Sequence, residues 1–290
     1  MRAYARTMSA HAGAAGTPAE LLRRRVADDP SRPLVTFYDD ASGERVELSA
    51  RTFGNWVAKT ANFLVDGLAA EPGTRVVLVL PPHWQTAVWL MACWSAGLVA
   101  EAVDPEDFRR GGAEPDGASD PYILAAAQEV LDDVLADDVL AGGAEEIVGL
   151  SLHALGGPLA DCPPGVTDYA AEVRAYGDRF VPGPGVVPEA PALSVTKTTF
   201  SAAELVGAAR GAVEKWELDA RDRLLVDMSF ATLDGVLTCL LAPLASGASV
   251  IIQRNFDKAA LDRRLTLEHV TVVAGTPGPN DESGSVYRLP

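Results

Sequence analysis

The stretch TRVVLVLPPHWQTAVWLMACWSAGLVAEAVDP, residues 74–105, contains a complete strand–helix–strand pattern. Residues 74–82 form a continuous apolar run of the kind found in strands that are buried on both faces. Residues 83–96 have the spacing of a helix, and Gly97 stands where a helix would end. Residues 98–105 supply the second strand. The stretch therefore predicts a β-α-β unit whose two strands run parallel.

The same alternation extends to both sides of this unit. Towards the N-terminus, a capping box from Thr17 to Glu20 opens a helix, and residues 33–49 predict a hairpin. Ser49 then begins an amphipathic helix that ends near Gly67. Further strands are expected at 122–126, 145–152, 191–195, 223–228, 248–253 and 270–275. Further helices are expected at 128–135, 167–180, 233–245 and 257–268, and another begins at Ser201. This alternation predicts an α/β fold of three layers, with mostly parallel sheets and helices on both faces.

Local composition predicts how the chain is divided. We expect a flexible N-terminus at 1–16 and a first α/β lobe at 17–182. The Pro/Gly-rich stretch at 183–191 predicts a linker. A second α/β lobe at 192–275, packed on the first, and a flexible tail at 276–290 complete the expected organisation.

Bulk properties narrow the class of protein. With 290 residues and 48% hydrophobic composition, the chain can bury a substantial core. Its formal net charge of −16 is spread along the sequence, which argues against nucleic acid or an anionic membrane as a partner. Cys93, Cys162 and Cys239 are far apart and predict packing roles rather than a metal site. No apolar run reaches the length of a membrane span, so we expect a cytoplasmic protein.

The common catalytic motifs are missing from the sequence. No Gly-Lys dipeptide occurs, which excludes a Walker loop, and no Gly-x-Ser-x-Gly marks a hydrolase nucleophile. His11, His83, His153 and His269 are isolated, and each is expected to be a surface or structural histidine rather than a catalytic base. We therefore assign no catalytic residue and no metal ligand.

The stretch PALSVTKTTFSAAEL, residues 191–205, predicts a buried strand, a polar turn of four residues and a capped helix. A turn of this kind at the start of a helix is where many proteins bind phosphate. Phosphate loops need glycine for close backbone approach, however, and none occurs between Gly185 and Gly207.

Several short motifs, taken in order, carry a resemblance. Pro72-Gly73-Thr74-Arg75-Val76, then Ala96-Gly97, then Asp104-Pro105 resemble the start of AMP-forming adenylating enzymes of the acyl-CoA synthetase and luciferase type. Residues 200–209 and 222–252 continue the resemblance, which covers most of 17–275. It implies the fold of the N-terminal domain of an adenylate-forming enzyme. The chain also resembles a small actinobacterial group with distant similarity to AMP-binding enzymes.

The departures from the family concern ATP. Members carry a Ser/Thr/Gly-rich loop ending in lysine, where this chain has only Lys197-Thr198-Thr199-Phe200. Members often have an aromatic-His pair after the next strand, where this chain has Phe230 and Ala231. The sequence also stops before the family's Tyr-Gly-x-Thr-Glu stretch, its ribose-binding Asp and its lid lysine. We therefore do not expect ATP or Mg²⁺ to bind tightly, and we expect no other cofactor.

A ligand pocket, if the fold keeps one, is expected at the carboxyl ends of the parallel strands. The candidate residues on one side are Thr196, Lys197, Thr198 and Thr199, which would hold an anion, and those on the other are Phe230 for an apolar body and Thr232 and Asp234 for polar groups. In the alternative interpretation the threonines cap the helix, Phe230 is core, and Lys197 pairs with a carboxylate. The residues alone leave both interpretations open.

Two functional hypotheses follow. The first is a non-catalytic, adenylating-enzyme-like protein that binds a small ligand or a protein partner. The second is an acyl-CoA synthetase-like enzyme with residual or altered acyl-handling chemistry. Because a complete adenylating enzyme packs more structure against the part retained here, we also expect a homodimer that covers an exposed strand edge or apolar face.

Overall fold

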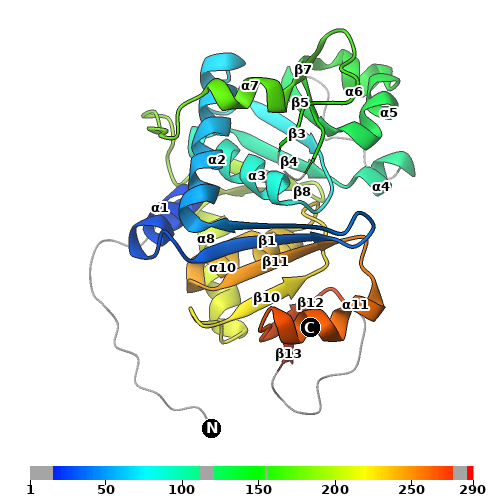
Figure 1. Cartoon of the computed structure of the whole chain (residues 1–290). Helices are drawn as coiled ribbons and strands as arrows, with labels where there is room; N and C mark the ends of the chain where they lie inside the picture. The colour runs from blue at the N-terminus through cyan, green and yellow to red at the C-terminus, as the bar shows by residue number, and fades with distance from the viewer. Residues whose placement is uncertain (1–15, 112–120, 154–155, 277–285, 290) are drawn as a thin grey trace.

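A computed structural model describes residues 16–111, 121–153, 156–276 and 286–289. Their strands form two sheets, which lie one above the other in Figure 1. The seven-stranded sheet has the order β7 (Val166–Asp168), β6 (Ala144–Leu150), β5 (Tyr122–Ala127), β3 (Arg75–Val79), β4 (Val99–Val103), β8 (Pro191–Val195) and β9 (Thr198–Ser201). The six-stranded sheet has the order β13 (Tyr287–Arg288), β12 (Val272–Ala274), β10 (Arg223–Val226), β11 (Ser249–Arg254), β1 (Pro33–Asp39) and β2 (Glu44–Ser49).

Both sheets are parallel except at one edge strand each. β9 runs antiparallel to β8, and β2 runs antiparallel to β1. The expected hairpin at 33–49 and the expected β-α-β unit at 74–105 are therefore both present.

The helices begin where the sequence places caps. The capping boxes of Thr17 with Glu20 and of Ser201 with Glu204 both form, and Gly97 ends its helix in the left-handed conformation at φ 76°. The longer helices are α1 (Pro18–Asp28), α2 (Ala50–Asn62), α3 (Trp84–Ala96), α8 (Ala202–Lys215) and α11 (Lys258–Leu267). The shorter helical segments are η1 (Phe63–Gly67), α4 (Pro105–Arg109), η2 (Gln128–Val130), α5 (Leu131–Leu135), α6 (Asp138–Gly142), α7 (Tyr169–Glu172), η3 (Val173–Ala175), α9 (Leu233–Val236), η4 (Leu237–Leu241) and α10 (Ala242–Ser246).

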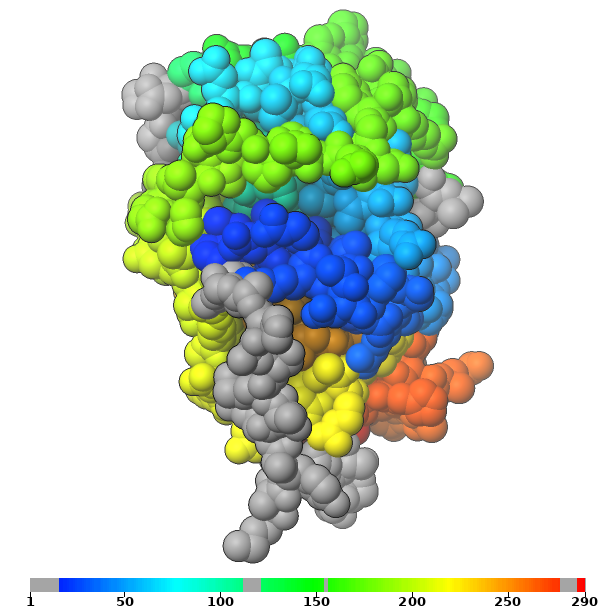
Figure 2. All heavy atoms as spheres, turned by 90° about the vertical axis from the view of Figure 1, so that its left-hand side faces the viewer, coloured from blue at the N-terminus to red at the C-terminus, as the bar shows by residue number. Residues whose placement is uncertain are grey.

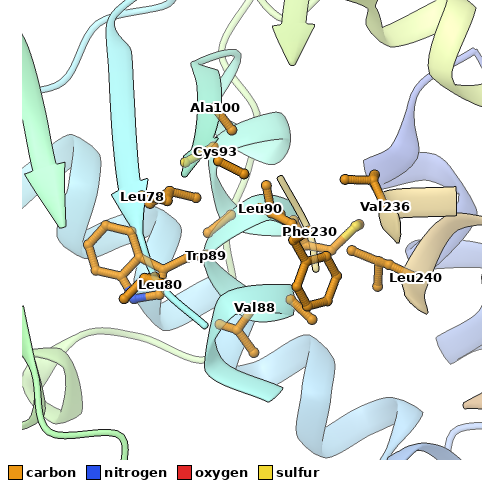
Figure 3. Close-up of a cluster of buried hydrophobic side chains, with 14 of the residues drawn as sticks. Leu78, Leu80, Val88, Trp89, Leu90, Cys93, Ala100, Phe230, Val236 and Leu240 are labelled. Carbon is orange, nitrogen blue, oxygen red and sulfur yellow. The ribbon is translucent and has the colours of Figure 1, made fainter. Parts of the chain in front are cut away.

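The helix α3 is the centre of the core. All 13 of its residues are buried, as an apolar sequence around the whole helix requires. One side of α3 faces the seven-stranded sheet, where Trp89 lies beside Leu78 and Leu80 (Figure 3). Its other side meets Phe230 and the helical segment after it (Figure 3). A single helix therefore belongs to the hydrophobic core of both sheets.

The six-stranded sheet carries helices on both faces. On β10, Leu224 and Val226 point into the main core, whereas Leu225 points to the opposite face. There Leu225 joins Leu261 of α11 in a second, smaller cluster. The α/β fold with helices on both faces is thus confirmed.

The expected boundary at 183–191 does not separate the two sheets. β1 and β2 come from the expected first lobe but lie in the sheet of β10 to β12. β8 and β9 come from the expected second lobe but complete the seven-stranded sheet. The physical reason is that parallel strands pair across long crossovers, so that Val35 of β1 finds its partner in Val250 of β11.

Part of the expected flexible tail is a strand. The N–H of Tyr287 donates to the carbonyl of Thr271 at 2.8 Å, and that of Leu289 donates to Val273 at 2.9 Å. β13 thereby satisfies backbone groups along the outer side of β12, an edge that would otherwise be open. Residues 1–15 and 277–285, where flexible ends were also expected, lie outside the described residues. The homodimer stays a prediction, and this covered edge no longer argues for it.

The loop between β10 and α9 allows a sharp test of the packing. A Cβ at Gly235 would lie 1.8 Å from the carbonyl oxygen of Ser229. Gly235→Ala should therefore lower the free energy of unfolding by more than about 2 kcal/mol. Urea denaturation followed by circular dichroism measures this change.

Gly207→Ala is the matched control, because the same added methyl group on α8 would meet no atom within 4 Å. We expect it to leave stability unchanged or to raise it by up to about 1 kcal/mol, since alanine favours a helix over glycine. Equal effects of the two variants would contradict the described packing.

Candidate functional site

The predicted phosphate-type turn is a closed hairpin. Val195 pairs with Thr198 in the β8–β9 ladder, so the turn consists of Thr196 and Lys197 alone. Both residues have positive φ, 49° and 61°, as in the two-residue turns that join antiparallel strands. The expectation of a four-residue turn is therefore wrong, because Thr198 and Thr199 belong to β9.

The side chains of this hairpin have neither of the roles that the alternative interpretation gave them. Ser201, not a threonine of the turn, caps α8 by accepting the N–H of Glu204. Within the described chain, Lys197 forms no ion pair. Thr196, Lys197, Thr198 and Thr199 are all exposed.

The second group of candidates is mainly structural. Phe230 is only 1% exposed and lies in the core beside α3 (Figure 3). The hydroxyl of Thr232 caps α9 by accepting the N–H of Gly235 at 3.1 Å. Asp234 is exposed in the first turn of that helix. Phe230 and Thr232 thus match the structural alternative, and Asp234 keeps a free surface position.

The structure does not link the two groups. Among the described residues, no hydrogen bond or ion pair joins 196–199 to 230–234. The cavity described below is also lined by none of these residues. A shared pocket between them stays a prediction.

Other polar groups at the carboxyl ends were not singled out by the sequence. Arg254, at the end of β11, forms an ion pair with Glu129, just after β5, and so ties the two sheets together. The carboxyl group of Glu44 lies nearby, and burial raises its pKa. Sequence reasoning could not find this cluster because its members come from strands of different sheets.

His83 is a buried helix cap rather than a surface residue. Its Nδ1 accepts the N–H of Gln85 at 3.1 Å, at the start of α3, and its ring meets Phe37 of β1 edge-on at 4.3 Å. Burial lowers the pKa of His83 to about 3, so the ring stays neutral at physiological pH. Its role is structural, as expected, although it is fully buried.

A groove of about 810 Å³ lies elsewhere, between α1, α2 and residues 178–188. We call it the α1–α2 groove and call residues 178–188 the strap. Figure 2 looks onto this side, with α1 in dark blue and the strap in yellow-green. The groove is lined by Thr17, Ala19, Glu20, Leu22, Arg23, Val26, Arg51, Gly54, Asn55, Val57, Ala58, Ser95, Asp178, Arg179, Phe180, Val181, Pro182, Gly183, Val186 and Pro188.

Metal-ligand clusters and membrane-spanning helices would also bear on function. In the part of the chain that the structure describes, no group of three or more His, Cys, Asp or Glu side chains could hold a metal ion. Over the same residues, no helix is long and apolar enough to cross a membrane.

The chain is similar to known proteins in sequence and in fold. The family model described as AMP-binding enzyme matches residues 22–113. A fatty acyl CoA synthetase of Mycobacterium tuberculosis superposes with a TM-score of 0.66 at 16% identity, over 89% of this chain and 49% of that one. An anthranilate CoA ligase solved with anthranoyl-AMP gives 0.71 at 15% identity, over 89% and 49%. The chain spans about half the length of these two solved proteins, and the likeness shows their fold.

Sequence similarity is stronger to a shorter relative. A Mycobacterium tuberculosis protein described as "TIGR03089 family protein" is 42% identical over 246 residues, which cover 84% of this chain and 92% of the relative. An acetyl-coenzyme A synthetase of Gamma-proteobacterium EBAC31A08 is 29% identical over 122 residues, 42% of this chain and 18% of that protein. Residues 22–113 thus resemble the AMP-binding enzymes, the described residues share the fold of acyl-CoA synthetases, and the chain belongs to the TIGR03089 family.

Proposed function

We propose that this protein is a non-catalytic relative of the adenylating enzymes, which binds a small ligand or a protein partner and does not activate carboxylates with ATP. The closed β8–β9 turn carries the proposal. In the family that the sequence resembles, a glycine-rich loop stands between the corresponding strand and helix. Here β8 and β9 pair up to Val195 and Thr198, and the two residues between them complete a tight hairpin.

The electrostatics of adenylation support the same conclusion. Transfer of an adenylyl group requires backbone N–H groups or cations around the phosphates, to balance the charge that develops in the transition state. The hairpin offers Lys197 as its one cation, on a turn that has no glycine to let the backbone approach a phosphate. Ala231 also stands where family members often have histidine.

Acyl transfer through a thiol has less support. Cys93 and Cys239 are fully buried, and burial raises the pKa of both thiols. The pKa of the exposed Cys162 is also raised, first by desolvation and then by Asp168 and Asp161. A reactive thiol needs a lowered pKa, so none of the three is prepared to carry an acyl group. We place this binding protein in the cytoplasm, where free cysteines are common.

Nucleotide binding tests the proposal. ATP with Mg²⁺ at millimolar concentration should leave the Tm unchanged, whereas a ligand at a hundred times its Kd would add about 2.7 kcal/mol of stability. Differential scanning fluorimetry measures the shift, with a complete acyl-CoA synthetase as the positive control. A Tm that rises with ATP concentration would overturn the proposal.

The hairpin gives a second test. Thr196 and Lys197 both hold positive φ without being glycine or asparagine, a conformation that costs most residues about 1 kcal/mol or more. The double variant Thr196→Asn/Lys197→Gly should therefore raise the free energy of unfolding by about 1–2 kcal/mol. Chemical denaturation measures the change.

Thr198→Gly serves as the control, because this residue lies in the β8–β9 ladder opposite Val195. We expect it to lower stability, since glycine weakens a strand. A loss of stability in the double variant would show instead that the side chains of the turn make contacts that the chain needs.

A further inference from the structure

The α1–α2 groove lies on the side of the molecule away from the predicted site. The N–H of Arg51 donates to the carbonyl of Pro30 at 2.9 Å, just before β1 begins. On the strap, Val186 lies against Gly97, just before β4. The groove therefore lies at the amino ends of strands from both sheets, whereas the predicted site lies at their carboxyl ends.

The strap that closes one side of the groove is fixed at both ends. On its N-terminal side, Lys59 of α2 forms an ion pair with Asp178 at 2.8 Å, and the side-chain amide of Asn62 donates to the carbonyl of Arg179 at 2.9 Å. On its C-terminal side, the N–H of Ala203 donates to the carbonyl of Pro188 at 2.7 Å. A ligand would therefore meet a largely preformed site, which lowers the entropy cost of binding.

More than half of the residues that line the groove are apolar or glycine. Leu22 and Val26 of α1 face Val57 and Ala58 of α2, and Phe180 of the strap completes the lining. A volume of about 810 Å³ is within the usual range for small-molecule sites, about 300–1,000 Å³. The groove can therefore cover the apolar body of a small ligand.

The charged residues of the groove are not balanced. Asp178 is paired with Lys59, and Arg23 forms an ion pair with Glu20 at 3.4 Å. The carboxyl group of Glu20 also accepts the N–H groups of Gly16 and Thr17. By contrast, the exposed side chains of Arg51 and Arg179 have no hydrogen-bond or ion-pair partner among the described residues. Two unpaired guanidinium groups beside an apolar hollow favour an anion, because guanidinium binds carboxylate and phosphate with two parallel hydrogen bonds.

We propose that the α1–α2 groove binds a small amphipathic anion, with its apolar body between α1 and α2 and its carboxylate or phosphate head at one of the two exposed arginines that stand at the ends of α2, Arg51 or Arg179. This inference gives the proposed binding function a ligand class and rests on it. The chain's own residues 1–15 do not fit this role, because they contain Arg2 and Arg6 and no carboxylate side chain.

Calorimetric titration of the full chain tests the proposal with four probes that share an eight-carbon chain. Octanoate and octyl phosphate carry the two candidate head groups, octanol has no charge, and octyltrimethylammonium has the opposite charge. We expect octanoate, octyl phosphate or both to bind. The anion that binds more tightly shows whether the natural head group is a carboxylate or a phosphate. Binding of neither anion, or equal binding of the alcohol or the cation, would overturn the proposal.

Charge variants separate this site from general anion binding. Arg51→Ala/Arg179→Ala should weaken anion binding tenfold or more, because it removes the charge-assisted hydrogen bonds to the head group. The matched control is Arg221→Ala/Arg263→Ala, which removes two exposed arginines outside the groove and should leave the affinity unchanged. Equal affinities of the two double variants would overturn the proposal.

A variant of the groove interior provides an independent check. Ala58→Trp should abolish binding by filling the hollow, and an unchanged circular dichroism spectrum would show that the chain still folds. Light scattering shows whether a second copy of the chain occupies the groove instead. A dimer that buries the groove and is not dissociated by octanoate would overturn the proposal. Because ATP is not among these probes, failure here is distinguishable from failure of the non-catalytic function.

Discussion

The helix α3 has apolar side chains around its whole circumference, and it is stable only where protein surrounds it on every side. Trp89 and its neighbours face the seven-stranded sheet, while the opposite side packs against Phe230 and the helical segment that follows it. Neither sheet could cover this helix alone. The burial of α3 therefore requires that both sheets form together.

The same constraint explains why the fold does not depend on the turn between β8 and β9. The β8–β9 hairpin lies at the edge of its sheet, and the side chains of its turn are exposed. The length of the turn can therefore change without disturbing the packing around α3. By contrast, Phe230 belongs to the core that α3 needs, which gives a physical reason for an aromatic residue there whether or not a ligand is bound. The fold therefore constrains Phe230 but not the length of the β8–β9 turn.

Local features could be predicted from the sequence, because they depend on neighbouring residues. The capping box at Thr17, the cap at Ser201 and the end of α3 at Gly97 all form where the motifs predict them. The parallel β-α-β unit and the hairpin of β1 with β2 follow from apolar spacing and turn residues.

Features that depend on pairing between distant segments could not be predicted in this way. The partnership of β1 with β11 and the strand β13 near the C-terminus are of this kind, since parallel pairing leaves no local signal in either strand. The α1–α2 groove is equally non-local, because Arg51 and Arg179 line one groove only through the path of the strap. The sequence directed attention instead to Lys197, whose residue type suggested an anion site but whose turn is closed.

Native-state hydrogen exchange tests the central claim, that α3 joins the two sheets into one cooperative unit. The backbone amides of β3 and β5 would be compared with those of β10 and β11. The account predicts that both sets exchange with the same free energy of opening, equal to that of global unfolding, because opening either sheet would expose α3. A free energy of opening clearly lower for one sheet than for the other would contradict it.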